Sequence, residues 1–232
     1  MEKVLILLRR NDSDESWCER LRGPVARELL GTDPPGLTVN VRDDAVAETA
    51  LQLTTLDPPV TAVVTVWTRQ CYGEQVRAIV ELLRGEADAV AAYLVTESTP
   101  LPPPDPGAGQ RTPGLANVAL LRRPADLDRR TWLHRWQVEH TPVALATQAT
   151  FGYTQNTVVR ALTADAPAVD GIVEELFPAA AATDPLAWYG AADDAELQER
   201  LGRMLASITR FGADTDIDTV PTSRYLLRSP FS

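Results

Sequence analysis

The feature that most constrains this chain is an internal repeat. Two apolar runs, "KVLILLRR" beginning at Lys3 and "NVALLRRP" beginning at Asn117, both contain a closing pair of arginines. Each run is followed by a polar turn and then by a tryptophan-bearing segment of helical spacing that contains Pro-Val-Ala, at Pro24 and at Pro142. Self-similarity of this kind indicates a repeated supersecondary unit. The 232 residues therefore predict two copies of one unit.

The correspondence continues along both halves. "GLTVNVRDDAV" matches "FGYTQNTVVRAL" as a second strand, and "VTAVVTVWT" matches "AVDGIVEELF" as a third. "GEQVRAIVELLRG" matches "DAELQERLGRMLASI" as a second helix, and a closing strand follows in each half, with Tyr93 matched to Tyr225. Each half is thus predicted to run β-α-β-β-α-β, which is the ferredoxin-like motif.

Composition sets the predicted boundaries. Residues 1–101 form the first repeat and residues 115–232 the second, while residues 102–114 are dense in Pro and Gly and predict a linker. Strand runs such as "VLILL" and "TAVVTVW" are apolar throughout, which indicates that both of their faces are covered. We therefore predict the α+β class, with two ferredoxin-like repeats packed sheet-to-sheet as an α+β barrel. The alternative is two independent α+β domains on a linker.

Charge and hydropathy exclude several classes of partner. The net charge of −10 disfavours nucleic acid and anionic membrane surfaces, and no apolar run reaches the roughly 20 residues of a spanning helix. The apolar stretch at the N-terminus is too short for a signal peptide, so we expect a cytoplasmic protein. Cys18 and Cys71 lack metal-ligand spacing. Lys3 is the only lysine and lies at the chain start, so a buried Schiff-base lysine is not expected.

Both histidines lie in one predicted helix. Trp132, Trp136 and His140 are spaced by four residues, which places them on one helix face, directed toward the sheet. His134 lies about 160° from Trp132 and is expected to face solvent. Pro142 should kink or end the helix, and a helix C-terminus favours a protonated His140. The alternative is that the tryptophans are core residues and that His140 is a satisfied structural histidine.

The strand "YTQN" adds three candidates. Alternation sends Tyr153 and Gln155 to one face and Asn156 to the other. Either Tyr153 or Asn156 could donate to a substrate carbonyl, or these could be an ordinary buried aromatic and a strand-end turn residue. The sequence contains no G-x-S-x-G motif of a serine hydrolase, and no glycine-rich phosphate-binding loop follows a predicted strand. The two histidines do not share a helix face, which disfavours a metal site formed by both. We therefore expect no metal and no cofactor.

The segments "LLRRPADLDRRTWLHRWQVEHTP" and "YTQN" resemble the EthD-domain family of the dimeric α+β barrel superfamily. The resemblance covers about residues 117–229 and weakens over residues 1–101, where Arg22-Gly23-Pro24 stands in place of His140-Thr141-Pro142. It implies paired ferredoxin-like units with helices outside and a cleft between sheet and helices. Relatives in the superfamily include small monooxygenases, polyketide cyclases and isomerases acting on aromatic or polyketide compounds. The tandem repeat departs from the family's single-domain pattern.

Together these observations predict a cofactor-free enzyme of the cyclase, dehydratase or isomerase type, acting on a small hydrophobic carbonyl, aromatic or polyketide compound. His140 would be the acid or base, with Tyr153 or Asn156 holding the oxyanion. Trp132, Trp136 and Gln155 would bind the substrate. The alternatives are a non-catalytic binding protein and an accessory protein whose cleft is filled by its own tryptophans. We expect one site per chain, in a monomer with an intrachain barrel or in a homodimer.

Overall fold

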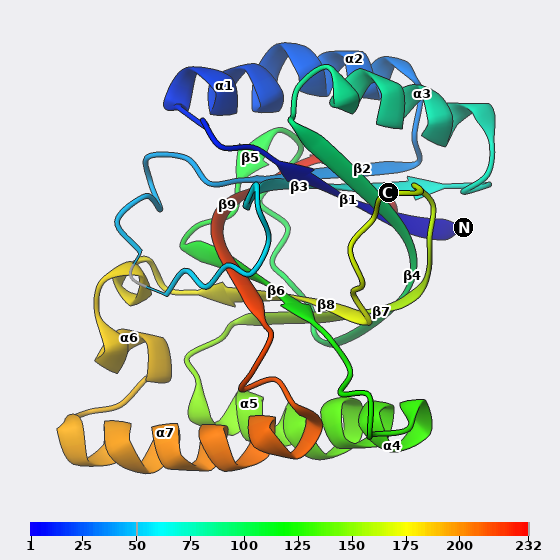
Figure 1. Cartoon of the computed structure of the whole chain (residues 1–232). Helices are drawn as coiled ribbons and strands as arrows, with labels where there is room; N and C mark the ends of the chain where they lie inside the picture. The colour runs from blue at the N-terminus through cyan, green and yellow to red at the C-terminus, as the bar shows by residue number, and fades with distance from the viewer. Residues whose placement is uncertain (50, 232) are drawn as a thin grey trace.

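The chain folds into a closed antiparallel barrel with helices packed outside it (Figure 1). The computed structural model describes residues 1–49 and 51–231. Its first half contains β1 (Glu2–Arg9), α1 (Glu15–Arg20), a π-helical turn (Leu21–Val25), α2 (Ala26–Gly31), β2 (Gly36–Val41), β3 (Val60–Thr68), α3 (Glu74–Arg84) and β4 (Ala89–Leu101). The second half contains β5 (Gln110–Arg111), β6 (Leu115–Leu121), α4 (Arg129–Leu133), a π-helical segment (His134–His140), α5 (Thr141–Thr147), β7 (Gly152–Ala161), β8 (Gly171–Phe177), α6 (Pro185–Tyr189), α7 (Asp194–Ile208) and β9 (Asp218–Arg228), with 3₁₀ turns at Ala179–Ala182 and Thr209–Phe211.

The strands join the two halves into one ring. Their order is β2-β3-β1-β4-β7-β8-β6-β9, and a further pairing of β2 with β9 closes it. The halves meet edge to edge, through β4 with β7 and through β2 with β9, and every pair is antiparallel. Within each half the strands lie in the order second, third, first, fourth. The predicted α+β class and barrel are therefore confirmed, and the alternative of two independent α+β domains on a linker is wrong.

Strand alternation separates an inner from an outer face. On β1, Leu5 and Leu7 belong to an apolar cluster inside the barrel, while Val4, Ile6 and Leu8 pack under the helices of the first half. Because the inner face is enclosed and the outer face is covered, these strands need no polar face. Figure 1 shows α1, α2 and α3 over one side of the barrel and α4, α5 and α7 over the other.

The helices begin where the sequence offers a capping carboxylate. The side chains of Asp14, Asp128 and Asp193 accept from the backbone N–H of Trp17, Thr131 and Glu196 at the starts of α1, α4 and α7. No helix among residues 1–49 and 51–231 has both the length and the apolar character that crossing a membrane requires.

Three local predictions need correction. The segment 102–114 is not wholly a linker, because Gln110 and Arg111 pair with Leu226 and Tyr225 of β9. The helix does not end at Pro142: the backbone widens into π-helical turns over His134–His140 and then continues as α5. Tyr93 and Tyr225 are not equivalent, since Tyr93 lies in the inner cluster and Tyr225 packs against the outer one.

Candidate functional site

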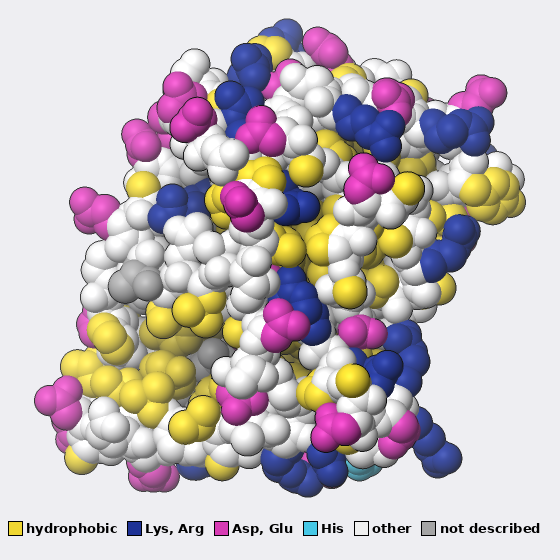
Figure 2. All heavy atoms as spheres, in the orientation of Figure 1, with side chains coloured by type: hydrophobic (Ala, Val, Ile, Leu, Met, Phe, Trp, Pro, Cys, Tyr) yellow, Lys and Arg dark blue, Asp and Glu magenta, His cyan; other side chains and the backbone are white. Residues whose placement is uncertain are grey.

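A cleft lies between the sheet of the second half and the helices that cover it. Its volume is about 310 Å³, within the range of small-molecule sites. β6, β7 and β8 form its floor, and the π-helical segment, α6 and α7 form its roof. Leu51 and Leu53, from the loop after β2, and Leu205 of α7 line it while remaining about half exposed. Figure 2 shows apolar side chains gathered at the lower left, between that loop and α7.

The tryptophan stripe packs onto a glycine. Trp132 and Trp136 are fully buried with ring centroids 4.9 Å apart, as the four-residue spacing predicts. A Cβ on Gly171 of β8 would come within 2.6 Å of the Trp136 ring and 3.2 Å of the Trp132 ring, so only glycine lets both indoles reach the sheet. Trp136 lines the cleft, whereas Trp132 donates to the carbonyl of Phe211 and does not line it.

His140 faces the cleft as a neutral imidazole. It is 7% exposed, its Nδ1 lies 3.0 Å from the hydroxyl oxygen of Ser207, and its ring lies 5.0 Å from that of Phe211. Burial lowers the pKa of His140 to about 4. The expectation of a protonated His140 is therefore wrong, because the helix continues past it and the surroundings are apolar. His134 is exposed, as predicted.

A buried carboxyl group forms the polar centre of the cleft floor. Glu175 of β8 lies in register with Asn117 of β6 on one side and with Tyr153 of β7 on the other. All three are at least nine-tenths buried, and all three line the cleft. Burial raises the pKa of Glu175 to about 7, against a smaller opposing effect of a hydrogen bond with Asn117. A carboxyl group of this kind is populated in both its acid and its base forms near neutral pH.

The surroundings of Glu175 complete an apolar pocket with a few polar groups. Burial, together with the charge of Glu175, raises the pKa of Tyr153 and of Tyr189, so both phenols remain protonated donors. Within the described part of the chain, Asn117 Oδ1 and Gln148 Oε1 are buried without a hydrogen-bond partner, and both residues line the cleft. Such acceptors favour a ligand that can donate to them.

The structure divides the predicted site residues between two faces. His140, Tyr153 and Trp136 meet at the cleft, while Gln155 is buried beside it and donates to Thr141 Oγ1 at 2.9 Å. Asn156 points into the barrel, as alternation predicts, so it cannot act together with His140. Sequence reasoning missed Glu175. The signal was the pair Glu174-Glu175 in the otherwise apolar "GIVEELF", since a strand covered on both faces directs one carboxyl group into each interior.

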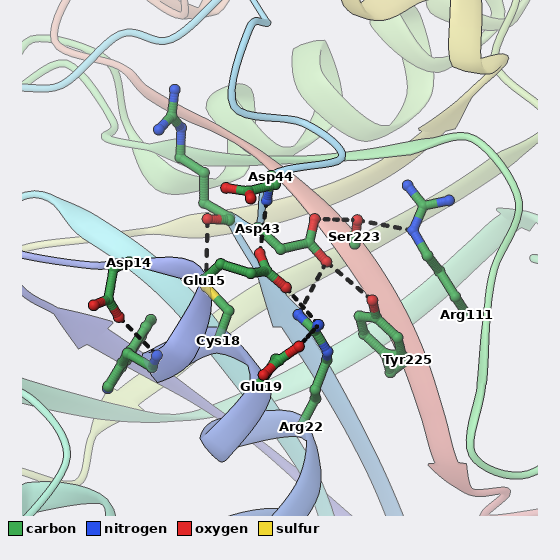
Figure 3. Close-up of polar contacts among 12 residues, drawn as sticks. Asp14, Glu15, Cys18, Glu19, Arg22, Asp43, Asp44, Arg111, Ser223 and Tyr225 are labelled. Carbon is green, nitrogen blue, oxygen red and sulfur yellow. Dashed lines mark hydrogen bonds and ion pairs between the residues drawn. The ribbon is translucent and has the colours of Figure 1, made fainter.

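The corresponding place in the first half holds an ion-pair cluster. Arg22, which stands where the second half has His140, lies between Glu15 and Asp43 (Figure 3). Asp43 also accepts from the hydroxyl groups of Ser223 at 2.7 Å and Tyr225 at 2.9 Å. These groups satisfy one another and tie β9 to the loop after β2. The cluster therefore stabilises the junction of the two halves.

The inner face of the barrel holds a second hollow of about 600 Å³. Lys3 lines it and is only 9% exposed, so a position near the chain start does not keep this lysine out of the interior, as the sequence argument against a buried Schiff-base lysine assumed. It pairs with Glu97 and lies 4.9 Å from the centre of the Trp67 ring. No cluster of three or more His, Cys, Asp or Glu side chains that could hold a metal ion occurs within residues 1–49 and 51–231.

The comparisons with known proteins bear on the fold. No family model matches the chain, and no curated protein matches it. Among solved structures, an anthrone oxidase-like protein aligns with a TM-score of 0.54 at 10% identity, over 99% of this chain and 94% of that one. A candidate monooxygenase from Lactobacillus acidophilus NCFM gives 0.47 at 11% identity, over 98% and 96%. Another from Fusobacterium nucleatum subsp. nucleatum ATCC 25586 gives 0.45 at 7%, over 98% and 92%. The first of these likenesses supports the α+β barrel fold, and the EthD resemblance stays a prediction.

Proposed function

We propose that the chain is a cofactor-free enzyme that moves a proton on a small, largely apolar carbonyl or aromatic compound bound in the cleft of the second half. The observation that carries the proposal is the buried carboxyl group of Glu175, whose pKa is raised to about 7 on the floor of an apolar pocket. A general base or acid works best when its pKa lies near the working pH. This assigns Glu175 the proton transfer that the sequence suggested for His140.

The proposed step is proton abstraction from a carbon next to a carbonyl group. The carboxylate of Glu175 takes the proton, the C–H electron pair forms an enolate, and a phenol of Tyr153 or Tyr189 donates to its oxygen. Return of the proton to another carbon of the same molecule completes an isomerisation. If the enolate carbon instead attacks a second carbonyl group of the substrate, whose oxygen takes the proton, the result is a cyclisation. If the enolate expels a β-hydroxyl group, which takes the proton and leaves as water, the result is a dehydration. No oxidant is consumed. His140, neutral and held near Ser207 Oγ, orients the substrate against Trp136.

Three features agree with this class of ligand. The indole side chains of Trp136 and Trp188 line the cleft, and leucines line its exposed mouth. The solved structure with the TM-score of 0.54 is named for anthrone, which is an aromatic ketone. The EthD resemblance implies the same cleft.

We further propose that the two halves are ferredoxin-like repeats, because they share one strand order and one place for a proline-associated π-helical turn.

The test is hydrogen exchange at carbon in deuterated water. The wild-type protein should accelerate deuterium incorporation into an aromatic ketone such as anthrone, measured by mass spectrometry. Glu175→Gln should reduce that rate by about 10²–10⁴-fold, because general acid–base assistance contributes about that much. Glu199→Gln, the same change at an exposed position of α7, is the matched control and should keep the rate.

His140 is tested in the same assay. His140→Ala should lower the rate, while His134→Ala, on the exposed side of the same helix, should not. Equal rates for wild type and Glu175→Gln would remove the assignment of the base. Binding of the ketones without exchange in the wild type would instead favour the alternative, a non-catalytic protein that holds a hydrophobic metabolite.

A further inference from the structure

The hollow inside the barrel is separate from the cleft. Inward-facing residues line it, among them Leu5 of β1, Val118 of β6 and Ile172 of β8. Ala119 and Val173, on the opposite face of β6 and β8, line the cleft instead. Along β1, the hollow ends between Leu5 and Leu7. Lys3 and Leu5 line it, whereas Leu7, the next inward-facing residue, is packed in the apolar cluster inside the barrel. Residues 102–105 and 229–231 line it as well, from the segments that follow β4 and β9.

Four of the five charged residues that line this hollow form two ion pairs, and the fifth, Asp105, is exposed and accepts from the backbone N–H of Gly107. Lys3 pairs with Glu97, and Arg224 Nε donates to Glu174 Oε1 at 3.0 Å. Asn40 donates to the other oxygen of Glu174 at 2.9 Å. An anionic ligand would have to displace the partly buried carboxylate of Glu97 or Glu174 from its cation or lie beside it, and a charge withdrawn from water without its own partner is costly. The site therefore favours a neutral molecule.

Two polar side chains that line the hollow favour a ligand that carries a hydroxyl group. Asn156 is 1% exposed, and its Nδ2 donates to the carbonyl of Ile172 at 3.1 Å, so its Oδ1 is an acceptor fixed in orientation. Asn156 Oδ1 and the hydroxyl of Thr38 are buried without a hydrogen-bond partner among the residues that the structure describes. Both residues line the hollow, and leaving such groups unpaired costs free energy that a donating ligand would recover.

We propose that the barrel interior is a second binding site, for a neutral phenol or alcohol with an apolar body. The hydroxyl group would donate to Asn156 Oδ1 and meet Thr38, while the body packs on Leu5, Val118 and Ile172. The volume of about 600 Å³ admits a molecule of two or three fused rings. This site does not depend on the chemistry proposed for the cleft, because Glu174 and Glu175 face opposite sides of β8.

A matched pair of probes tests the proposal: 1-naphthol, which is neutral, and 1-naphthoate, which is anionic and of similar shape. Titrations are followed by calorimetry and by NMR of methyl groups. Val118 lines the barrel hollow and Val173 lines the cleft, so their methyl shifts report which one is filled. We expect naphthol to shift Val118 and naphthoate to bind there at least tenfold more weakly.

Variants sharpen the test. Asn156→Leu should weaken naphthol binding at Val118 about tenfold, since it removes the acceptor, and Thr38→Val, which keeps the side-chain shape, gives a second measure if that variant folds poorly. Glu174→Gln should release Arg224 and raise the affinity for naphthoate at least tenfold. Glu175→Gln, the same change one residue later, should not. The proposal is overturned if naphthol leaves Val118 unshifted, if naphthoate binds there equally well, or if the Asn156 and Thr38 variants both bind naphthol like the wild type.

Discussion

Replacing Glu175 with glutamine should stabilise the protein above neutral pH and leave its stability nearly unchanged in acid. Burial raises the pKa of this carboxyl group from an ordinary 4.5 to about 7 in the folded state. The folded protein therefore binds a proton more tightly than the unfolded chain does. The stability that the protonated group contributes is present below pH 4.5 and is lost as the pH rises through 7.

The magnitude follows from the two pKa values. At about 1.4 kcal/mol for each pKa unit, the charged carboxylate costs the folded state about 3 kcal/mol at pH 8. Glutamine has a similar shape and never ionises, so Glu175→Gln avoids this cost. The wild type and the variant should differ by about 3 kcal/mol in free energy of unfolding at pH 8, and by much less at pH 4.5.

Urea unfolding of both proteins at intervals from pH 4.5 to pH 8 measures this difference directly. His140 also titrates in the acid part of the range, but its contribution is common to both proteins and cancels. Glu199→Gln, the same change at an exposed position of α7, is the matched control for the substitution itself. A constant difference between wild type and Glu175→Gln across the range would mean that Glu175 titrates normally, which would refute both the linkage and its role as the proton-transfer group.

Three further predictions concern packing and protonation. Gly171→Ala should destabilise the protein by about 1–3 kcal/mol in thermal or urea unfolding, because its Cβ would overlap the ring of Trp136, whereas Gly202→Ala, with nothing within 4 Å, should stabilise α7 by about 0.5–1 kcal/mol. Burial lowers the pKa of His140 from 6.5 to about 4, so the stability that the neutral imidazole contributes is lost as the pH falls through that range. Between pH 7 and pH 4, the free energy of unfolding of His140→Gln should therefore fall by about 3 kcal/mol less than that of the wild type. An identical acid dependence of the two proteins would contradict the burial argument. Thr38→Val should raise the free energy of unfolding by about 1 kcal/mol by removing a buried hydroxyl group without a partner in the described structure, and a lower unfolding midpoint would show that the hydroxyl is satisfied.

The sequence by itself determined the periodic features. Apolar runs without a polar face predicted strands covered on both sides, and the repeated order of runs predicted an α+β barrel. The four-residue spacing placed Trp136 and His140 on one buried helix face, and alternation separated Tyr153 from Asn156. These properties depend only on the 3.6-residue and two-residue periods of the backbone, so a single sequence is enough to find them.

Only the tertiary structure decided which groups meet and in what state. Asn117, Glu175 and Tyr153 lie far apart in the chain, and they form one row because of the register of β6, β8 and β7. Closure of the ring buries Lys3 near the start of the chain, and it places Glu174 in an interior different from that of its neighbour. The pKa values of His140 and Glu175 follow from desolvation, which depends on what packs around a group and not on its position in the sequence.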